Sequence, residues 1–253
     1  ELDEALRIRR EEQLPVYERL GDVRSRAVTQ GKIADVLQAR GELDEALRIR
    51  REEELPVYER LGDVRSRAVT QGKIADVLQA RGELDEALRI RREEQLPVYE
   101  RLGDVRSRAV TQGKIADVLQ ARGELDEALR IRRGEELPVY ERLGDVRERA
   151  VTQGKIADVL QARGELDEAL RIWREEELPV YERLGLAREA LICRAKIGLN
   201  YLARGAAGNR EKALELLNLA LRDAQRLKLP EARQIAEIIR QVQAPSDSLV
   251  SRG

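Results

Sequence analysis

Hydrophobic and polar residues recur at helical spacing along most of the chain, and residues 64–79 show the pattern clearly. Val64, Ala68, Ile74, Ala75 and Leu78 fall on one face when this segment is wound as an α-helix. We therefore predict a helix here, called helix A below, whose apolar face packs against a neighbouring element.

Signals for both ends of helix A flank this run. Asp63 directly precedes it, and its carboxylate can accept hydrogen bonds from the first free backbone amides. At the other end, Arg81 complements the negative end of the helix dipole, and Gly82 can adopt the left-handed turn that ends helices. Another helical pattern adjoins this glycine, so two antiparallel helices are expected in each unit.

The second predicted helix, helix B, has its apolar residues in two groups separated by a charged segment. In residues 43–61 the groups are Leu43, Ala46, Leu47 and Ile49, and then Leu55, Val57, Tyr58 and Leu61. A proline lies in the second group, and proline removes a backbone donor and clashes with the preceding turn. Helix B therefore either kinks or breaks and restarts; the strong helix formers of the charged segment favour a kink. The same choice arises at Pro15, Pro56, Pro97, Pro138 and Pro179.

The same pair of helices recurs with a period of 41 residues. The string Glu-Leu-Asp-Glu-Ala-Leu-Arg-Ile begins at residues 1, 42, 83, 124 and 165, and the copies between these starts are nearly identical. One helix pair cannot bury its apolar stripe alone, so stacking against the next copy is expected to bury it. By length alone this period also suits HEAT and armadillo arrays.

The residues around the turn between helices resemble the tetratricopeptide repeat family. The turn has Gly41, then Leu43 and Ala46, and the preceding helix A carries a large, small, large pattern. The residues that carry this resemblance are Ile33, Ala34 and Leu37, and in the last copy Ile197, Gly198, Tyr201, Ala213, Leu217 and Ala220. The resemblance covers roughly residues 1–243. The family's usual unit has about 34 residues, and the surplus here is two helical turns, similar to the long repeats of kinesin light chains and bacterial multidomain proteins.

This resemblance implies the fold and a general function. The expected fold is all-α, a right-handed superhelix of stacked antiparallel helix pairs. The expected function is a non-catalytic protein–protein interaction scaffold, the docking or sensing part of a larger protein. A cytoplasmic location is expected on other grounds: we see no membrane-spanning run or signal segment, and the lone Cys193 is compatible with a reducing compartment. Two positions depart from the family: Arg50 replaces the usual aromatic residue, which only Trp173 restores, and Glu53 replaces the usual alanine.

Sequence divergence divides the chain into three expected parts. Residues 1–185 hold the near-identical copies, beginning in a helix B; residues 186–243 hold a diverged last copy and a C-terminal capping helix; residues 244–253 are expected to be a flexible tail. Because the chain begins inside a copy and without methionine, we expect it to be a piece of a longer protein. The apolar stripe of its first helix, formed by Leu2, Ala5, Leu6 and Ile8, is expected to pack against a second molecule or a preceding repeat.

In the family that the chain resembles, helix A lines the concave side, which identifies candidate protein-binding residues. By helical spacing they are Val28, Lys32, Asp35, Gln38, Val69, Lys73, Asp76, Gln79, Val110, Lys114, Asp117, Gln120, Val151, Lys155, Asp158 and Gln161. A repeated pattern suits an extended partner, because weak contacts along it sum through avidity. A solvated face without a partner explains the same residues equally well, in which case the chain is a structural spacer or self-associating rod.

Composition and charge argue against other functions. The 47 basic and 48 acidic residues leave a net charge of −1, so we see no basic stripe for nucleic acid. The chain has no histidine and one cysteine, which removes the commonest general base and metal ligands. We therefore expect no catalytic, cofactor or metal site. No apolar run approaches the roughly 20 residues that span a membrane.

Two further features have alternative interpretations. The Arg-Arg-Glu-Glu-Glu run from Arg50 is either a solvated helix surface or a ladder in which Arg50 and Arg51 reach acidic residues of the adjacent copy. Cys193 stands where earlier copies have threonine; a small packing residue is a better interpretation than a reactive thiol.

Overall fold

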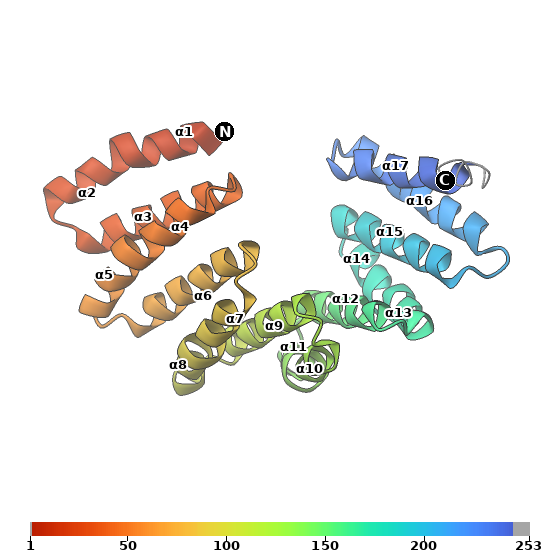
Figure 1. Cartoon of the computed structure of the whole chain (residues 1–253), viewed down its shortest axis with the longest axis horizontal. Coiled ribbons are helices and arrows are strands. Elements are labelled where there is room, and N and C mark those ends of the chain that lie inside the picture. Colours follow the sequence, from red (N-terminus) through yellow and green to blue (C-terminus); the bar gives the residue numbers. More distant parts are fainter. Residues whose placement is uncertain (1, 245–253) are drawn as a thin grey trace, which may run out of the picture. The chain divides into compact units, whose positions relative to one another are not determined.

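The computed structural model describes residues 2–244, and every regular element in this range is a helix (Figure 1). Helix A corresponds to α3 (Val23–Ala39), α6 (Val64–Ala80), α9 (Val105–Ala121), α12 (Val146–Ala162) and α15 (Ala187–Arg204). Helix B corresponds to α1 (Leu2–Arg7) with α2 (Leu14–Leu20), α4 (Leu43–Arg48) with α5 (Leu55–Arg60), α7 (Leu84–Arg89) with α8 (Leu96–Arg101), α10 (Leu125–Ile131) with α11 (Leu137–Leu143), α13 (Leu166–Ile172) with α14 (Leu178–Arg183), and α16 (Asn209–Arg226). The last helix is α17 (Glu231–Gln243). The predicted all-α architecture of helix pairs is confirmed.

The chain divides into two compact units, residues 1–131 and 132–253. The predicted boundary between residues 185 and 186 rests on sequence divergence instead, and it stays a prediction. Most of the predicted flexible tail, residues 245–253, lies outside the described residues.

The predicted signals at the ends of helix A are confirmed. The Asp63 carboxylate accepts a hydrogen bond from the backbone N–H of Ser66 at 2.9 Å, and Gly82 has a φ of 82°. The N–H of Glu83 donates to the carbonyl of Leu78 at 2.9 Å, which satisfies a carbonyl left free at the helix end. These local interactions fix where each helix A begins and ends.

Helix B contains a π-helical segment, which has a wider turn than an α-helix, just before its proline. In the second copy the segment is Ile49–Glu54, and the N–H of Leu55 donates to the carbonyl of Arg50, five residues earlier. Glu54 and Leu55 keep right-handed helical φ and ψ angles, so the helix does not break. A wider turn reduces the clash between the ring of Pro56 and the preceding carbonyls, and proline has no N–H to lose. The predicted restart is therefore wrong at Pro56, whereas the predicted kink stays a prediction.

Each interior helix A of the first unit packs between two helices B. Helix α6 contacts α4 and α5 before it and α7 and α8 after it. Four of its predicted apolar residues are at most 2% exposed, namely Ala68, Ile74, Ala75 and Leu78. Val64 is instead 45% exposed, as is Leu61 in helix B. Both lie beside the turn at Gly62, at helix ends, and the prediction that they join the core is wrong.

The second unit ends in three helices that share an apolar cluster. Helical patterns in the diverged last copy predict helices over about residues 187–203, 210–227 and 231–243, and these bounds agree with α15, α16 and α17 to within one residue. Ile235 and Ile239 of α17 pack with Leu191 of α15 and Leu217 of α16, and all four are buried. Helix α17 therefore covers apolar surface of the two preceding helices.

Candidate protein-binding surface

The predicted binding residues occupy one valine, one lysine, one aspartate and one glutamine position in each near-identical helix A. We call these residues of α3, α6, α9 and α12 the helix A face. Its valines are large hydrophobic residues at the surface: Val28, Val69 and Val110 are 39%, 46% and 47% exposed, and Val151 is half-buried. The four aspartates and four glutamines are half-buried, except the exposed Asp35.

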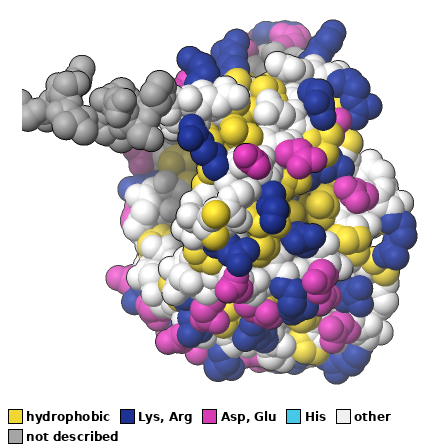
Figure 2. Space-filling view, turned by 90° about the vertical axis from the view of Figure 1, so that its right-hand side faces the viewer, with side chains coloured by type: hydrophobic (Ala, Val, Ile, Leu, Met, Phe, Trp, Pro, Cys, Tyr) yellow, Lys and Arg dark blue, Asp and Glu magenta, His cyan; other side chains and the backbone are white. Residues whose placement is uncertain are grey.

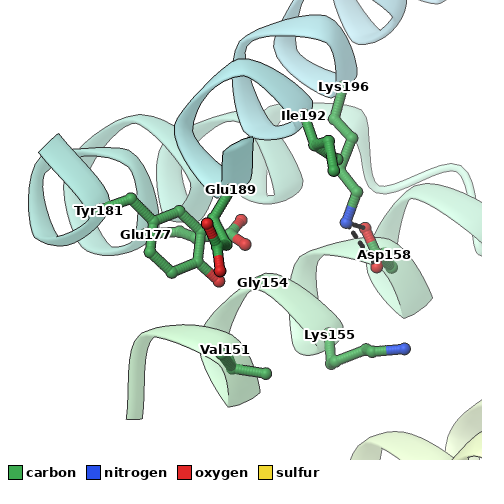
Figure 3. Close-up of a pocket in the computed structure, with 9 residues that line it drawn as sticks. All are labelled: Val151, Gly154, Lys155, Asp158, Glu177, Tyr181, Glu189, Ile192 and Lys196. Carbon is green, nitrogen blue, oxygen red and sulfur yellow. Dashed lines mark hydrogen bonds and ion pairs between the residues drawn. The ribbon is translucent and has the colours of Figure 1, made fainter. Parts of the chain in front are cut away.

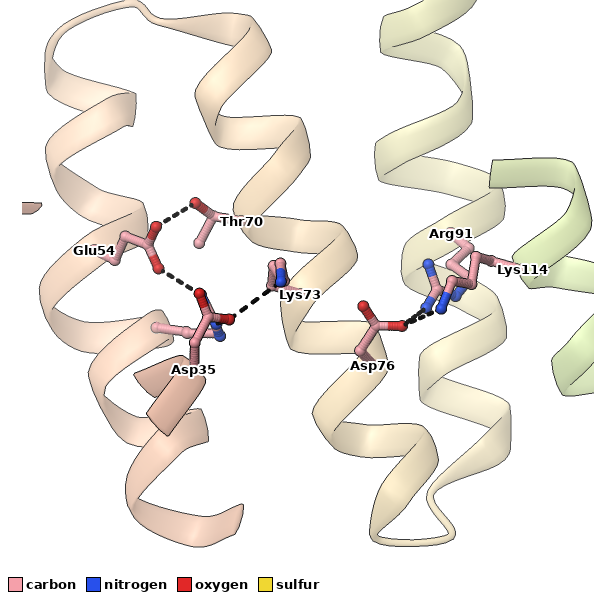
Figure 4. Close-up of polar contacts among 8 residues, drawn as sticks. Asp35, Glu54, Thr70, Lys73, Asp76, Arg91 and Lys114 are labelled. Atoms are coloured by element: carbon pink, nitrogen blue, oxygen red, sulfur yellow. Dashed lines mark hydrogen bonds and ion pairs between the residues drawn. The ribbon is translucent and has the colours of Figure 1, made fainter. Parts of the chain in front are cut away.

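Ion pairs connect the helix A face of one copy with that of the next (Figure 4). The Lys73 ammonium lies 3.1 Å from a carboxylate oxygen of Asp35, and the Lys114 ammonium lies 3.3 Å from Asp76. All four side chains are partly exposed, so each pair contributes at most about 1 kcal/mol. The pairs nevertheless bring predicted residues of successive copies together.

A buried arginine lies behind each of these aspartates. The Arg50 side chain is 2% exposed, and its guanidinium is 2.6 Å from Asp35 and 2.9 Å from Glu54. The next copy repeats the first contact, with the Arg91 guanidinium 2.6 Å from Asp76. A buried guanidinium without an acidic partner would be strongly destabilising. The acidic residues therefore allow arginine to occupy the place where the tetratricopeptide repeat family usually has an aromatic residue.

Contacts between adjacent copies include one made by Arg50. Its guanidinium binds Asp35 of the preceding copy and Glu54 of its own copy, and the Thr70 hydroxyl donates to Glu54 at 3.1 Å. The contact with Asp35 is the one that the ladder hypothesis predicts for Arg50, but the guanidinium that makes it is buried. At the neighbouring position, the Arg92 guanidinium lies 3.9 Å from Glu127 of the next copy.

Each near-identical helix A also has a central glycine that the sequence interpretation missed, Gly31, Gly72, Gly113 and Gly154. A Cβ atom at Gly31 would lie only 2.6 Å from Oε1 of Glu54. The glycine therefore leaves room for a helix B carboxylate against helix A. Glycine inside a helix costs about 1 kcal/mol relative to alanine. Its recurrence in every copy is the signal that could have predicted this contact.

Burial shifts the pKa values of acidic and basic groups that pair within helix B or between helix A and helix B. Removal from water raises the pKa of Glu54, and the Arg50 charge and the Thr70 hydroxyl oppose that rise. Removal from water likewise lowers the pKa of Arg91, and Asp76 opposes this change. The partner groups thus favour the charged forms inside the protein.

Pockets lie on the helix A face between successive copies. One of about 140 Å³ in the first unit is lined by Val69, Lys73 and Asp76 of α6 and by Val110 and Lys114 of α9. Arg91, Gln95 and Tyr99 of the intervening helix B also line it, and Gln79 does not. Residues predicted from spacing in two copies therefore border one pocket.

The second unit has a corresponding pocket of about 150 Å³ (Figure 3). The predicted residues Val151, Lys155 and Asp158 line it from α12, and the Asp158 carboxylate binds the ammonium of Lys196 at 2.7 and 2.8 Å. Gln161 does not line this pocket; its side-chain oxygen accepts a hydrogen bond from Asn200 at 3.2 Å.

Charged patches, metal-ligand groups and membrane-spanning helices among the described residues would indicate other functions. On the face shown in Figure 2, side chains of both charges are interspersed with hydrophobic ones. In residues 2–244, no group of three or more histidine, cysteine, aspartate or glutamate residues is arranged to hold a metal ion. No helix within the same range has the length and apolar character needed to cross a membrane.

Solved structures with similar folds are repeat proteins. BtubC from P. vanneervenii has a TM-score of 0.71 at 18% identity, covering 90% of this chain and 91% of that one. Nearly identical tetratricopeptide-like repeats of a putative kinesin light chain from Podospora anserina have a TM-score of 0.64 at 20% identity, covering 80% and 96%. A signal transduction ATPase with numerous domains and a tetratricopeptide repeat sensor, from Pyrococcus horikoshii, has a TM-score of 0.53 at 16% identity, covering 94% and 42%.

Neither a protein-family model nor a curated protein matches the sequence. The fold is established instead by the helix pairs, their stacking and the similar structures. In the part that the structure describes, this chain is a tetratricopeptide-repeat-like solenoid of long, nearly identical repeats.

Proposed function

We propose that the chain is a protein-binding scaffold that holds an extended polypeptide along its helix A face. The observation that carries this proposal is the repeated exposed valine beside a Lys–Asp pair, which borders a pocket between α6 and α9. Exposed apolar residues rimmed by polar groups are typical of interaction sites. Identical contacts in successive copies would add through avidity.

The proposed context is a docking or sensing part of a larger protein. Similarity to a structure described as containing a tetratricopeptide repeat sensor supports this context. The partner's identity and a cytoplasmic location stay predictions.

Valine substitutions test the binding proposal without disturbing the buried ion pairs. A peptide selected from a displayed library on the intact chain would be measured against the double variant Val69→Ser/Val110→Ser. We expect at least about tenfold weaker binding, because two repeated apolar contacts are lost.

The chain provides a matched control on the same helices. Val64 and Val105 are each 45% exposed, close to the 46% and 47% of Val69 and Val110, but they lie outside the helix A face. The double variant Val64→Ser/Val105→Ser should bind the peptide like the unmodified chain. Equal losses in both double variants would contradict a site on the helix A face.

A structural spacer is the second candidate function, and the ion pairs between copies favour it. Lys73 and Lys114 already bind aspartates of the preceding copy, so their charges serve stacking. If this is the whole role, library selection yields no peptide that depends on Val69 and Val110.

We also propose a second copy of the chain as a partner for the first helix B. Val16 in α2 is 38% exposed, whereas the equivalent Val57 in α5 is 2% exposed. Light scattering over a concentration series should show association that Val16→Ser weakens. A strict monomer at high concentration would exclude this contact.

A further inference from the structure

The last near-identical copy lacks the basic residue that neutralises its buried carboxylate. Glu177 occupies the position of Glu54 and is 5% exposed. Trp173 occupies the position of Arg50, and Cys193 occupies that of Thr70. The guanidinium that binds Glu54 at 2.9 Å therefore has no counterpart on this helix B.

The neighbours of Glu177 replace that charge only in part. Tyr181 hydrogen-bonds to it, and the Cys193 thiol lies 3.4 Å from Oε2, but a thiol is a weak donor. The Lys196 charge favours the ionised form of Glu177, but its ammonium is held by both oxygens of Asp158. The Glu177 carboxylate is thus buried without a dedicated counter-ion.

This carboxylate borders the pocket of the second unit. In Figure 3 the Glu177 and Glu189 carboxylates and the Tyr181 hydroxyl lie together at one side, and the Asp158–Lys196 pair lies at the other. The pocket of about 150 Å³ is also lined by Ile192, an apolar residue. A small group that enters it would meet three oxygen atoms of different side chains.

The charge of this pocket is opposite to that of its counterpart in the first unit. The pocket around Asp76 has three basic residues and one acidic residue among those that line it. The pocket around Glu177 has two basic and three acidic residues. The replacements at positions 173, 177 and 189 produce this change, since the equivalents of Trp173, Glu177 and Glu189 in the first pocket's copy are Arg91, Gln95 and Ser107.

We propose that the pocket around Glu177 binds the ammonium group of a lysine side chain on the protein partner. This inference rests on the proposed function and specifies the chemistry of one contact. The ammonium takes the electrostatic role that Arg50 has beside Glu54. Its three N–H donors match the carboxylates of Glu177 and Glu189 and the hydroxyl of Tyr181, and its alkyl chain packs on Ile192.

Binding at this pocket depends on pH. Burial raises the pKa of Glu177, although Lys196 and Tyr181 oppose the rise. A bound ammonium favours the ionised carboxylate, so affinity increases as pH rises through the range in which Glu177 loses its proton. The charged and titratable groups that face it are Lys155 and Asp158 of α12, Tyr181 of α14, and Glu189, Cys193 and Lys196 of α15.

The fluorescence of Trp173 provides a direct test, because it is the only tryptophan in the chain and is next to this site. The intact chain would be titrated with n-butylammonium chloride, and with n-butanol as the uncharged analogue. We expect a saturable change with the ammonium only, stronger at about pH 8 than at about pH 5. An equal response to the alcohol, or no response, would overturn the inference.

Two variants and a control locate the response. Glu177→Gln should weaken it at least about tenfold, and Gln95 at the equivalent position shows that glutamine is compatible with the repeat. Glu189→Gln, at a half-buried position, should also weaken the ammonium response. This second variant tests the site even if Glu177→Gln fails to fold. Glu54→Gln lies in the first unit and should leave the response unchanged. Unchanged binding in both pocket variants would refute the site.

The outcome is separable from that of the peptide experiment. Loss of peptide binding on substituting Val69 and Val110, without an ammonium response, would support the scaffold and reject the lysine pocket. A saturable ammonium response that requires Glu177, with no peptide selected, would support the pocket and reject the extended helix A site.

Discussion

Arg50 and Glu54 show how single residues determine the packing of a copy. Arg50 and Glu54 are both buried, and their guanidinium and carboxylate form a 2.9 Å ion pair. The sequence predicts that Arg50 either lies on a solvated helix surface or reaches acidic residues of the adjacent copy. Its burial depends on Asp35 and Glu54 approaching it from two helices, which periodicity alone cannot reveal.

Removal of one member of this pair should be strongly destabilising. Arg50→Met leaves Glu54 buried without its cation, and we expect a loss of about 3 kcal/mol in the free energy of unfolding. Urea denaturation monitored by circular dichroism measures it. The double variant Arg50→Met/Glu54→Leu removes both charges and should recover much of the loss. If the double variant is no more stable than the single one, the unpaired charge is not the cause.

Glu177 should make stability depend on pH. Its pKa is raised in the folded state by burial, so the folded protein holds this proton more tightly than the unfolded chain. This contribution is fully present below the ordinary glutamate value of 4.5 and is lost as pH rises through the raised value. When the pH rises from about 4.5 to about 8, the change in the free energy of unfolding should therefore be less favourable in the unmodified chain than in Glu177→Gln. An identical difference in both proteins would contradict an altered Glu177 proton affinity.

At the scale of elements, two glycines in helices have different roles. Gly31 in α3 faces the Glu54 carboxylate, whereas a Cβ atom at Gly134 would have nothing within 4 Å. Gly134 lies in the π-helical segment Arg132–Glu136, where other copies have glutamate. Gly31 is needed for the close packing of helix A on helix B. Gly134 has no such contact, and it increases the conformational entropy that the backbone loses on folding.

The corresponding alanine variants should change stability in opposite directions. Gly134→Ala should stabilise the protein by roughly 0.5–1 kcal/mol, because alanine has less conformational freedom to lose. Gly31→Ala should destabilise it by about 1–3 kcal/mol, because the added Cβ displaces a paired carboxylate. Thermal unfolding of both variants measures the difference. A shift of the same sign for both would contradict the close contact at Gly31.

At the scale of the whole molecule, stability comes from contacts between neighbouring copies. In the part of the chain that the structure describes, helix α6 packs chiefly on the helices B that directly precede and follow it, namely α4, α5, α7 and α8 with the π-helical segments between them. Repeat proteins of this kind gain stability as a sum of copies and their interfaces. A change in the number of copies should therefore change the stability of the chain and leave its helix content per residue nearly unchanged.

Deletion of one copy tests this additivity. Removing residues 64–104 joins Asp63 to Val105 and reproduces the Asp104–Val105 sequence at the start of helix A. The shortened chain should keep its far-ultraviolet ellipticity per residue and unfold at a lower temperature, because one interface is lost. Collapse of the helical signal would instead show that the chain folds as one indivisible core.

The repeat, the helix pairs, the capping by Asp63 and Gly82 and the bounds of α17 can be predicted without coordinates, because they depend on residues close together in the chain. Packing between helices was needed to show that Val64 and Leu61 are exposed, that Arg50 is buried and that Lys73 binds Asp35 of the preceding copy. The π-helical turn before Pro56 was likewise found only in the folded chain. These features depend on which side chains from separate helices meet within a few ångströms, and helical periodicity specifies a face but not its partner.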